Sequence, residues 1–271
     1  MADSVATRRT AADAATAPSG ATSTPTVGFL YPGFSAEDDY PRLESMLADA
    51  AGDTTGPGVR LPLVHTDIGE DAHRVDALLE MGSAARLAAR VADLKGLGAQ
   101  AVVWACTSAS FVYGYGGARE QVRELSAVAG LPASSTSFAF AHAIEDLGVE
   151  RVAVAATYPD DVAELFAAFL KTAGAEVVAR RASGIITAAE VGTWGRDEVL
   201  ALARAGDHPD AEAVLLPDTA LHSAAYIAEL ESALGKPVLT ANQVTAREGL
   251  RLLDHPAPHC PALGRLFSLV G

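Results

Sequence analysis

The chain has 271 residues, of which 49% are hydrophobic, and its formal net charge at pH 7 is −14. This length and composition predict a globular protein with one large core or two modest ones. The acidic balance argues against nucleic acid as a partner, because phosphate contacts need clustered Lys and Arg. No apolar run reaches the roughly 18–20 residues of a membrane span, and two cysteines indicate no disulfide framework. We therefore expect a cytoplasmic protein.

Residues 1–25 differ in composition from the rest of the chain, since they are rich in Ala, Thr and Ser. Arg8 and Arg9 are not followed by the apolar stretch of an export signal, and Asp3 and Asp13 argue against a transit peptide. A disordered extension is the interpretation that this composition favours.

Beyond residue 25, short apolar runs alternate with segments of helical periodicity. Strands are predicted at residues 26–32, 59–66, 99–105, 131–136, 151–157, 175–181, 211–217 and 236–240. Helices are predicted at residues 39–51, 75–97 (with a break near Gly82), 118–129, 138–147, 160–173, 197–205, 221–234 and 243–253. Strands that alternate with helices predict parallel sheets with right-handed crossovers.

The pattern of strands and helices occurs twice. Tyr31 and Pro32 end the first strand as Tyr158 and Pro159 end the fifth, and a Gly-x-Pro sequence precedes the last strand of each half. We therefore predict an α/β fold of two similar flavodoxin-like lobes, each with a four-stranded parallel sheet, related by a pseudo-twofold axis. The first lobe is placed at residues 26–137 and the second at 138–242, with the final segment, 243–271, packing back on the first lobe.

Two strands end in residues that can do chemistry. The strand at residues 99–105 is followed by Cys106, Thr107 and Ser108, and the corresponding strand of the second half is followed by Asp218 and Thr219. Ligands of such sheets bind at the carboxyl ends of the strands. If the lobes face each other, Cys106 and Asp218 approach one cleft from opposite sides.

A thiol opposite a carboxylate suits two-sided proton transfer or nucleophilic addition. Removing a proton or CO₂ next to a carboxylate develops an enolate-like charge, which preorganised donors must stabilise. The hydroxyl residues at the strand ends are the predicted donors and carboxylate ligands, namely Thr107, Ser108, Tyr158 and Thr219.

Plainer interpretations of the same residues remain open. Cys106 could be a small core residue, and Asp218 or Thr219 could cap a helix that begins near residue 221. His222 follows that motif by one helical turn, and a surface position is favoured for it. The glycines at 114–117 lack the lysine of a P-loop, so a flexible lid or turn is expected there. The segment 255–260 has residue types that bind metals but no second cluster, and we predict no metal site.

The order and spacing of these motifs resemble the aspartate/glutamate racemase superfamily, and within it the branch of maleate cis–trans isomerases and arylmalonate decarboxylases. The resemblance covers residues 26 to about 255 and is carried by Cys106-Thr107-Ser108, Ala156-Thr157-Tyr158 and Asp218-Thr219. It implies catalysis without a cofactor on a small carboxylic acid, with Cys106 as the first-lobe cysteine and Thr107, Ser108 and Tyr158 as carboxylate ligands. Asp218 stands where the second-lobe cysteine is most often found, which puts ordinary two-thiol racemisation in doubt.

From these features we expect an isomerase or racemase in which Cys106 is the nucleophile or base and Asp218 is the opposing acid or base. Such a thiol is expected to have a pKa well below the usual value of about 8.5. One alternative is an arylmalonate-type decarboxylase, in which Cys106 would protonate the face opposite to that used by the second-lobe cysteine of those enzymes. A carboxylate-binding protein without catalysis is another. A lyase or hydrolase and a homo-oligomer remain compatible with the sequence.

Overall fold

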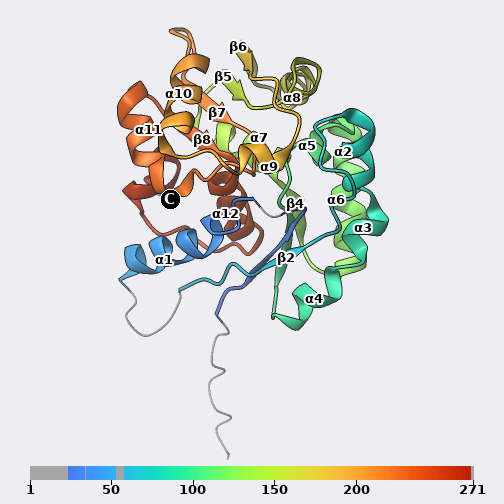
Figure 1. Ribbon diagram of the computed structural model, residues 1–271. Coiled ribbons are helices and arrows are strands. Elements are labelled where there is room, and N and C mark those ends of the chain that lie inside the picture. The colour runs from blue at the N-terminus through green and yellow to red at the C-terminus, as the bar shows by residue number, and fades with distance from the viewer. Residues whose placement is uncertain (1–23, 34, 53–57, 270–271) are drawn as a thin grey trace, which may run out of the picture.

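The computed structural model describes residues 24–33, 35–52 and 58–269. The predicted extension, residues 1–25, lies outside this range except for its last two residues. Two four-stranded parallel sheets lie in separate parts of the molecule (Figure 1), as the sequence predicted. No helix within the described ranges is both long and apolar enough to cross a bilayer.

The two sheets have the same strand order. The first has the order β2-β1-β3-β4, and the second has the order β6-β5-β7-β8. The strands of the first sheet are β1 (Val27–Tyr31), β2 (Leu63–His65), β3 (Ala101–Trp104) and β4 (Ala133–Ser135). Those of the second are β5 (Arg151–Ala156), β6 (Glu176–Ala182), β7 (Ala213–Leu216) and β8 (Val238–Thr240). The inner strands β1, β3 and β7 are buried at every residue, which explains why they read as continuous apolar runs.

Helices surround both sheets (Figure 1). Those before β5 are α1 (Asp39–Ala51), α2 (Val75–Met81), α3 (Ala84–Ala88), α4 (Val91–Gly96), α5 (Ser108–Phe111), α6 (Gly114–Ala129) and α7 (Thr136–Leu147). Those after β5 are α8 (Asp160–Thr172), α9 (Ala188–Val191), α10 (Arg196–Gly206), α11 (Ile227–Leu234) and α12 (Ala241–Leu252). Three short 3₁₀ helices complete the set: η1 (Ala224–Tyr226), η2 (Pro261–Leu263) and η3 (Arg265–Phe267).

The last helix of each half packs across the boundary between the halves. Helix α12 lies against α1, β1 and β3 of the first half, and an added Cβ at Gly249 would come within 2.4 Å of a methyl carbon of Val27. Phe140 of α7 packs on Phe166 of α8, with 5.4 Å between the ring centroids. One hydrophobic core therefore joins both halves. The division into lobes at residues 137 and 138 stays a prediction.

Three expected elements differ in the structure. The long helix at 75–97 is split into α2, α3 and α4, and the break at Gly82 allows close approach to α5, since an added Cβ would meet the Ala109 carbonyl oxygen at 2.1 Å. The expectation of a flexible lid or turn at 114–117 was wrong, because α6 begins at Gly114, which is itself left-handed with φ of 68°. The helix expected from residue 221 starts only at Ile227.

Candidate active site

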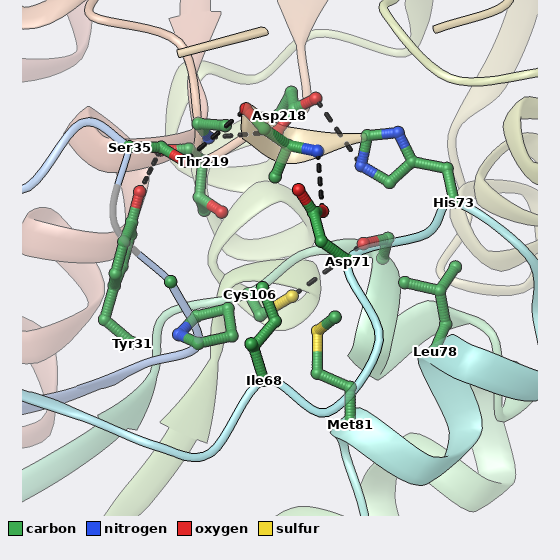
Figure 2. A pocket seen from close by; sticks show the side chains of 15 residues that line it. Tyr31, Ser35, Ile68, Asp71, His73, Leu78, Met81, Cys106, Asp218 and Thr219 are labelled. Carbon is green, nitrogen blue, oxygen red and sulfur yellow. Dashed lines mark hydrogen bonds and ion pairs between the residues drawn. The ribbon is translucent and has the colours of Figure 1, made fainter. Parts of the chain in front are cut away.

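A small cavity of about 20 Å³, partly open to solvent, lies at the carboxyl ends of β1, β3 and β7. Both halves of the chain contribute to its walls. Figure 2 shows Cys106, Ile68 and Met81 on one side and Asp218 with Thr219 on the other. The predicted thiol and carboxylate therefore line one shared cavity.

Cys106 lies two residues after Trp104, the last residue of β3, and shortly before the helix α5. The residue is 4% exposed, and its Sγ lies 3.8 Å from Ser108 Oγ. Burial raises the pKa of the Cys106 thiol to about 11, and the nearby Asp218 adds to this, while the backbone amides of Ala109 and Ser108 act in the opposite direction. The shift is opposite to the one expected for a nucleophile, so the thiol keeps its proton at neutral pH.

Asp218 is held by hydrogen bonds on both carboxylate oxygens. The Thr157 hydroxyl donates to Oδ2, and the Ala220 amide donates to Oδ1 at 2.9 Å. The next helical turn along the chain begins at Ala224, so the bond to Ala220 closes a local turn and the alternative in which Asp218 caps a helix at residue 221 does not hold. The residue is 4% exposed and lines the cavity.

His73 is a cavity residue that the sequence analysis did not single out. It lies in the loop between β2 and α2, which reads as polar and solvated, yet the residue is 5% exposed. Its Nε2 is 4.0 Å from Asp218 Oδ2, and its ring packs edge-on against Tyr158 with 4.9 Å between centroids. A lone histidine in a loop has no periodicity that could have revealed this position.

The predicted hydroxyl residues have different surroundings. Ser108 and Thr219 line the cavity. Thr107 is buried, and its Oγ1 has no hydrogen-bond partner among the described residues. Tyr158 is buried beside the cavity and donates its hydroxyl hydrogen to the Pro217 carbonyl at 2.9 Å. The roles of these four residues as carboxylate ligands stay predictions.

Tyr31 also contributes to the cavity wall, together with Pro32 and Gly33. Its hydroxyl donates to the Thr219 carbonyl at 3.0 Å and accepts from the Ala36 amide at 3.1 Å. Burial raises the pKa of Tyr31 well above its usual value, and the amide of Ala36 partly opposes this. The neutral phenol thereby connects the first half of the chain to the loop after β7.

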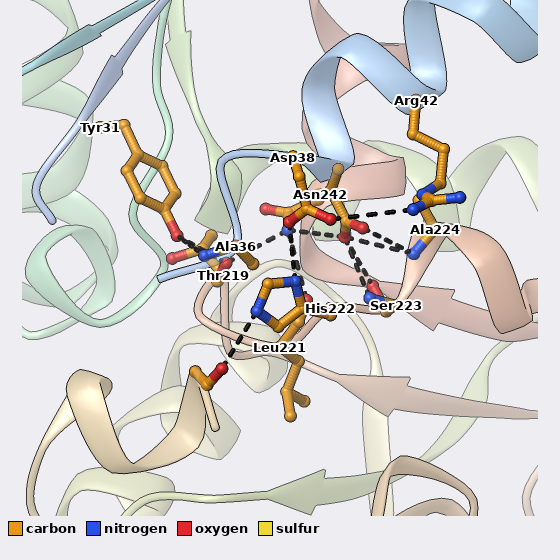
Figure 3. A network of polar contacts seen from close by, with 12 residues as sticks. Tyr31, Ala36, Asp38, Arg42, Thr219, Leu221, His222, Ser223, Ala224 and Asn242 are labelled. Carbon is orange, nitrogen blue, oxygen red and sulfur yellow. Dashed lines mark hydrogen bonds and ion pairs between the residues drawn. The ribbon is translucent and has the colours of Figure 1, made fainter. Parts of the chain in front are cut away.

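A buried polar network holds that loop in place. Asp39 accepts from the Ser223 amide at 3.0 Å and from the Ala224 amide at 3.2 Å. Asn242 donates to Asp39 at 3.0 Å and to the Thr219 carbonyl at 3.1 Å. Figure 3 shows Asn242, Ser223 and Ala224 gathered at the start of α1. These bonds hold residues 219–223 in a loop, which is why the predicted helix starts late.

His222 and the segment 255–260 do not line this cavity. His222 is paired with Asp38 at 2.7 Å. In the segment 255–260, the Sγ of Cys260 lies 3.7 Å from the Met46 carbonyl oxygen. Across the described ranges, no three His, Cys, Asp or Glu side chains are grouped to hold a metal ion.

Comparisons with known proteins identify the family to which the chain is similar. The family model described as arylmalonate decarboxylase matches residues 81–267. Arylmalonate decarboxylase of Bordetella bronchiseptica is 30% identical over 255 residues, which cover 91% of this chain and 98% of the relative. A maleate isomerase of Nocardia farcinica is 30% identical over 177 residues, which cover 62% and 69% of the two chains.

Solved structures share the fold. A maleate isomerase variant from Pseudomonas putida S16, crystallised with maleate, superposes with a TM-score of 0.79 at 23% identity, over 90% of this chain and 97% of that one. A liganded double mutant of arylmalonate decarboxylase gives a TM-score of 0.75 at 26% identity, over 90% and 99%.

Proposed function

The chain belongs to the family of arylmalonate decarboxylases and maleate isomerases, within the aspartate/glutamate racemase superfamily, and from this premise we propose that it decarboxylates a small malonate-type dicarboxylic acid. Loss of CO₂ leaves the bonding electron pair on an enediolate. The Sγ–H of Cys106 then protonates the α-carbon, which gives a monocarboxylate and a Cys106 thiolate. The thiolate regains a proton before the next turnover.

The burial of Cys106 in a cavity that it shares with Asp218 is the observation that carries this proposal. With a pKa of about 11, the thiol at neutral pH is a proton donor and only rarely a thiolate. A decarboxylase needs such an acid next to the enediolate, whereas addition to a double bond needs the thiolate as nucleophile. The isomerase expected from the sequence therefore becomes the second candidate.

The cavity walls favour a substrate with one carboxylate side and one apolar side. Ile68, Leu78 and Met81 form an apolar wall on the side of Cys106. Ser108 and Thr219 supply hydroxyl groups to the cavity wall. Neutral donors of this kind stabilise developing negative charge without forming an ion pair to the leaving carboxylate. An aryl or alkyl malonate matches both sides, whereas maleate has no apolar group.

Maleate-type isomerisation remains the alternative because an acceptor for the thiol proton lies in the same cavity. Asp218 could accept that proton, after which Cys106 Sγ would add to one alkene carbon. The adduct would rotate about the resulting single bond and then expel the thiolate to give the trans acid. The 30% identity to the Nocardia farcinica maleate isomerase supports this candidate.

Two substrates separate these candidates. The protein is incubated with phenylmalonate and, separately, with maleate, and CO₂, phenylacetate and fumarate are measured. The proposal predicts stoichiometric CO₂ and phenylacetate from phenylmalonate. Fumarate without CO₂ would overturn it in favour of the isomerase. Tight binding of phenylacetate without turnover of either acid would indicate a carboxylate-binding relative.

A further inference from the structure

His73 is fixed in the cavity by two hydrogen bonds to the segment before α9. Its backbone amide donates to the Ile186 carbonyl at 2.8 Å, and its Nδ1 lies 2.9 Å from the Ile185 carbonyl. A carbonyl oxygen only accepts, so Nδ1 must carry a hydrogen. The proton that His73 can gain or lose is therefore the one on Nε2, which faces Asp218.

Asp218 is suited to stabilise a proton on that nitrogen. Its two oxygens already accept hydrogen bonds from Thr157 and Ala220, which fix the orientation of the carboxyl group toward His73. The Oδ2 atom lies 4.0 Å from His73 Nε2, and both side chains are 5% exposed. Water screens such a buried pair far less than it screens a surface pair.

We propose that His73 and Asp218 form one proton-holding pair, which returns a proton to Cys106 after each turnover. The inference rests on the proposed decarboxylation. When Cys106 has given its proton to the enediolate, the proton on His73 Nε2 moves across the cavity to the Cys106 thiolate. The S–H bond forms as the N–H bond breaks, and neutral His73 then takes a proton from water. Each cycle consumes one proton and one malonate dianion, and releases one CO₂ and one monocarboxylate anion.

The other titratable groups around His73 are not placed to supply the proton that Cys106 needs. Asp71, from the same loop, also lines the cavity, but its carboxylate accepts from the Ala188 and Ala189 amides at 2.8 and 3.0 Å. Tyr158 meets the His73 ring edge-on, and burial raises its pKa well above the usual value. Tyr31 and Cys106 are likewise held neutral by burial. Among the described residues that line the cavity, His73 is the only histidine.

The substitution His73→Asn tests the pair while keeping the loop in place. The Asn amide nitrogen can still donate to the Ile185 carbonyl, but the exchangeable site at Nε2 is gone. With phenylmalonate as substrate, we expect kcat to fall at least about 10-fold, in line with the loss of a proton-transfer group, and KM to change less. The alkaline limb of the kcat profile should move to lower pH in Asp218→Asn and disappear in His73→Asn.

The matched control is Asp71→Asn, which weakens the attachment of the same loop to α9 without touching Nε2. It should lower kcat without moving the limb of the pH profile. A His73→Asn variant with an unchanged kcat and profile would overturn the proposal. So would an Asp71→Asn variant that shifts the profile as His73→Asn does, because the loop and not the proton would then be responsible.

A second measurement needs no substrate and separates this inference from the proposed reaction. Long-range ¹H–¹⁵N spectra of the protein labelled with ¹⁵N-histidine report the tautomer of His73. We expect Nδ1 to be protonated throughout and Nε2 to lose its proton at a lower pH in Asp218→Asn than in the unaltered protein. If neutral His73 carries its proton on Nε2, or if Asp218→Asn leaves its titration unchanged, the pair is refuted whatever acid the enzyme uses.

Discussion

Iodoacetamide should alkylate Cys106 at pH 7 about 100-fold more slowly than it alkylates a thiol of ordinary pKa. Only the thiolate reacts, and its fraction falls tenfold for each unit by which the pKa rises. Burial, together with the charge of Asp218 across the cavity, moves the pKa of Cys106 from 9.0 to about 11, which accounts for the factor of about 100. Restricted access would slow the reaction further at every pH.

The assay uses a Cys260→Ser background, because Cys260 is the only other cysteine of the chain. Intact mass gives the alkylation rate at each pH from 6 to 10, so that ionisation is separated from access. The rate should rise tenfold per pH unit without levelling off below pH 10. Asp218→Asn removes one cause of the raised pKa and should increase the rate at each pH. Levelling below pH 8.5 would refute the assignment of Cys106 as a proton donor and favour the isomerase.

Three further predictions concern stability and stereochemistry. Burial opposes ionisation of Glu248, but hydrogen bonds from Arg251 and His142 outweigh it and hold the pKa of Glu248 at about 2. The ionised side chain should therefore contribute about 3 kcal/mol to the free energy of unfolding above about pH 4.5, and this contribution should be lost as the pH falls to 2. Urea titrations of Glu248→Gln would show the loss. Gly249→Ala should lower the free energy of unfolding in urea by about 1–3 kcal/mol, because the added methyl overpacks against β1. The same change at exposed Gly116, which has open space around it, should raise it by about 0.5–1 kcal/mol. Decarboxylation of methyl(phenyl)malonate should give one enantiomer, because Cys106 reaches the enediolate only from the first-half side of the cavity. Chiral chromatography reads the product, and a racemate would contradict this.

Local patterns in the sequence were enough to predict the two sheets and the facing strand ends. Runs such as Ala101–Trp104 are buried on both faces, so their apolar character is continuous and easily recognised. The repetition of strand, helix and turn then placed Cys106 and Asp218 at corresponding ends. The structure confirms that these two residues line one cavity, while their chemical roles remain proposals.

The errors arose where a distant contact overrides a local preference. Residues 221–226 have helical periodicity, but Asp39, more than 180 residues earlier, binds the Ser223 and Ala224 amides and holds the segment in a loop. His73 was missed because its partners, Ile185 and Asp218, are more than 100 residues away. The raised pKa of Cys106 likewise depends on burial by the folded protein, which no local motif encodes.

The rate of CO₂ release from phenylmalonate by Cys106→Ala and Cys106→Ser, compared with the unaltered protein, tests the role of the thiol most directly. Alanine removes the proton donor, and serine replaces it with a far weaker acid of similar shape. We predict that the unaltered protein releases CO₂ and that both variants are at least about 100-fold slower, with unchanged thermal stability. Release at the unaltered rate by either variant would contradict the account.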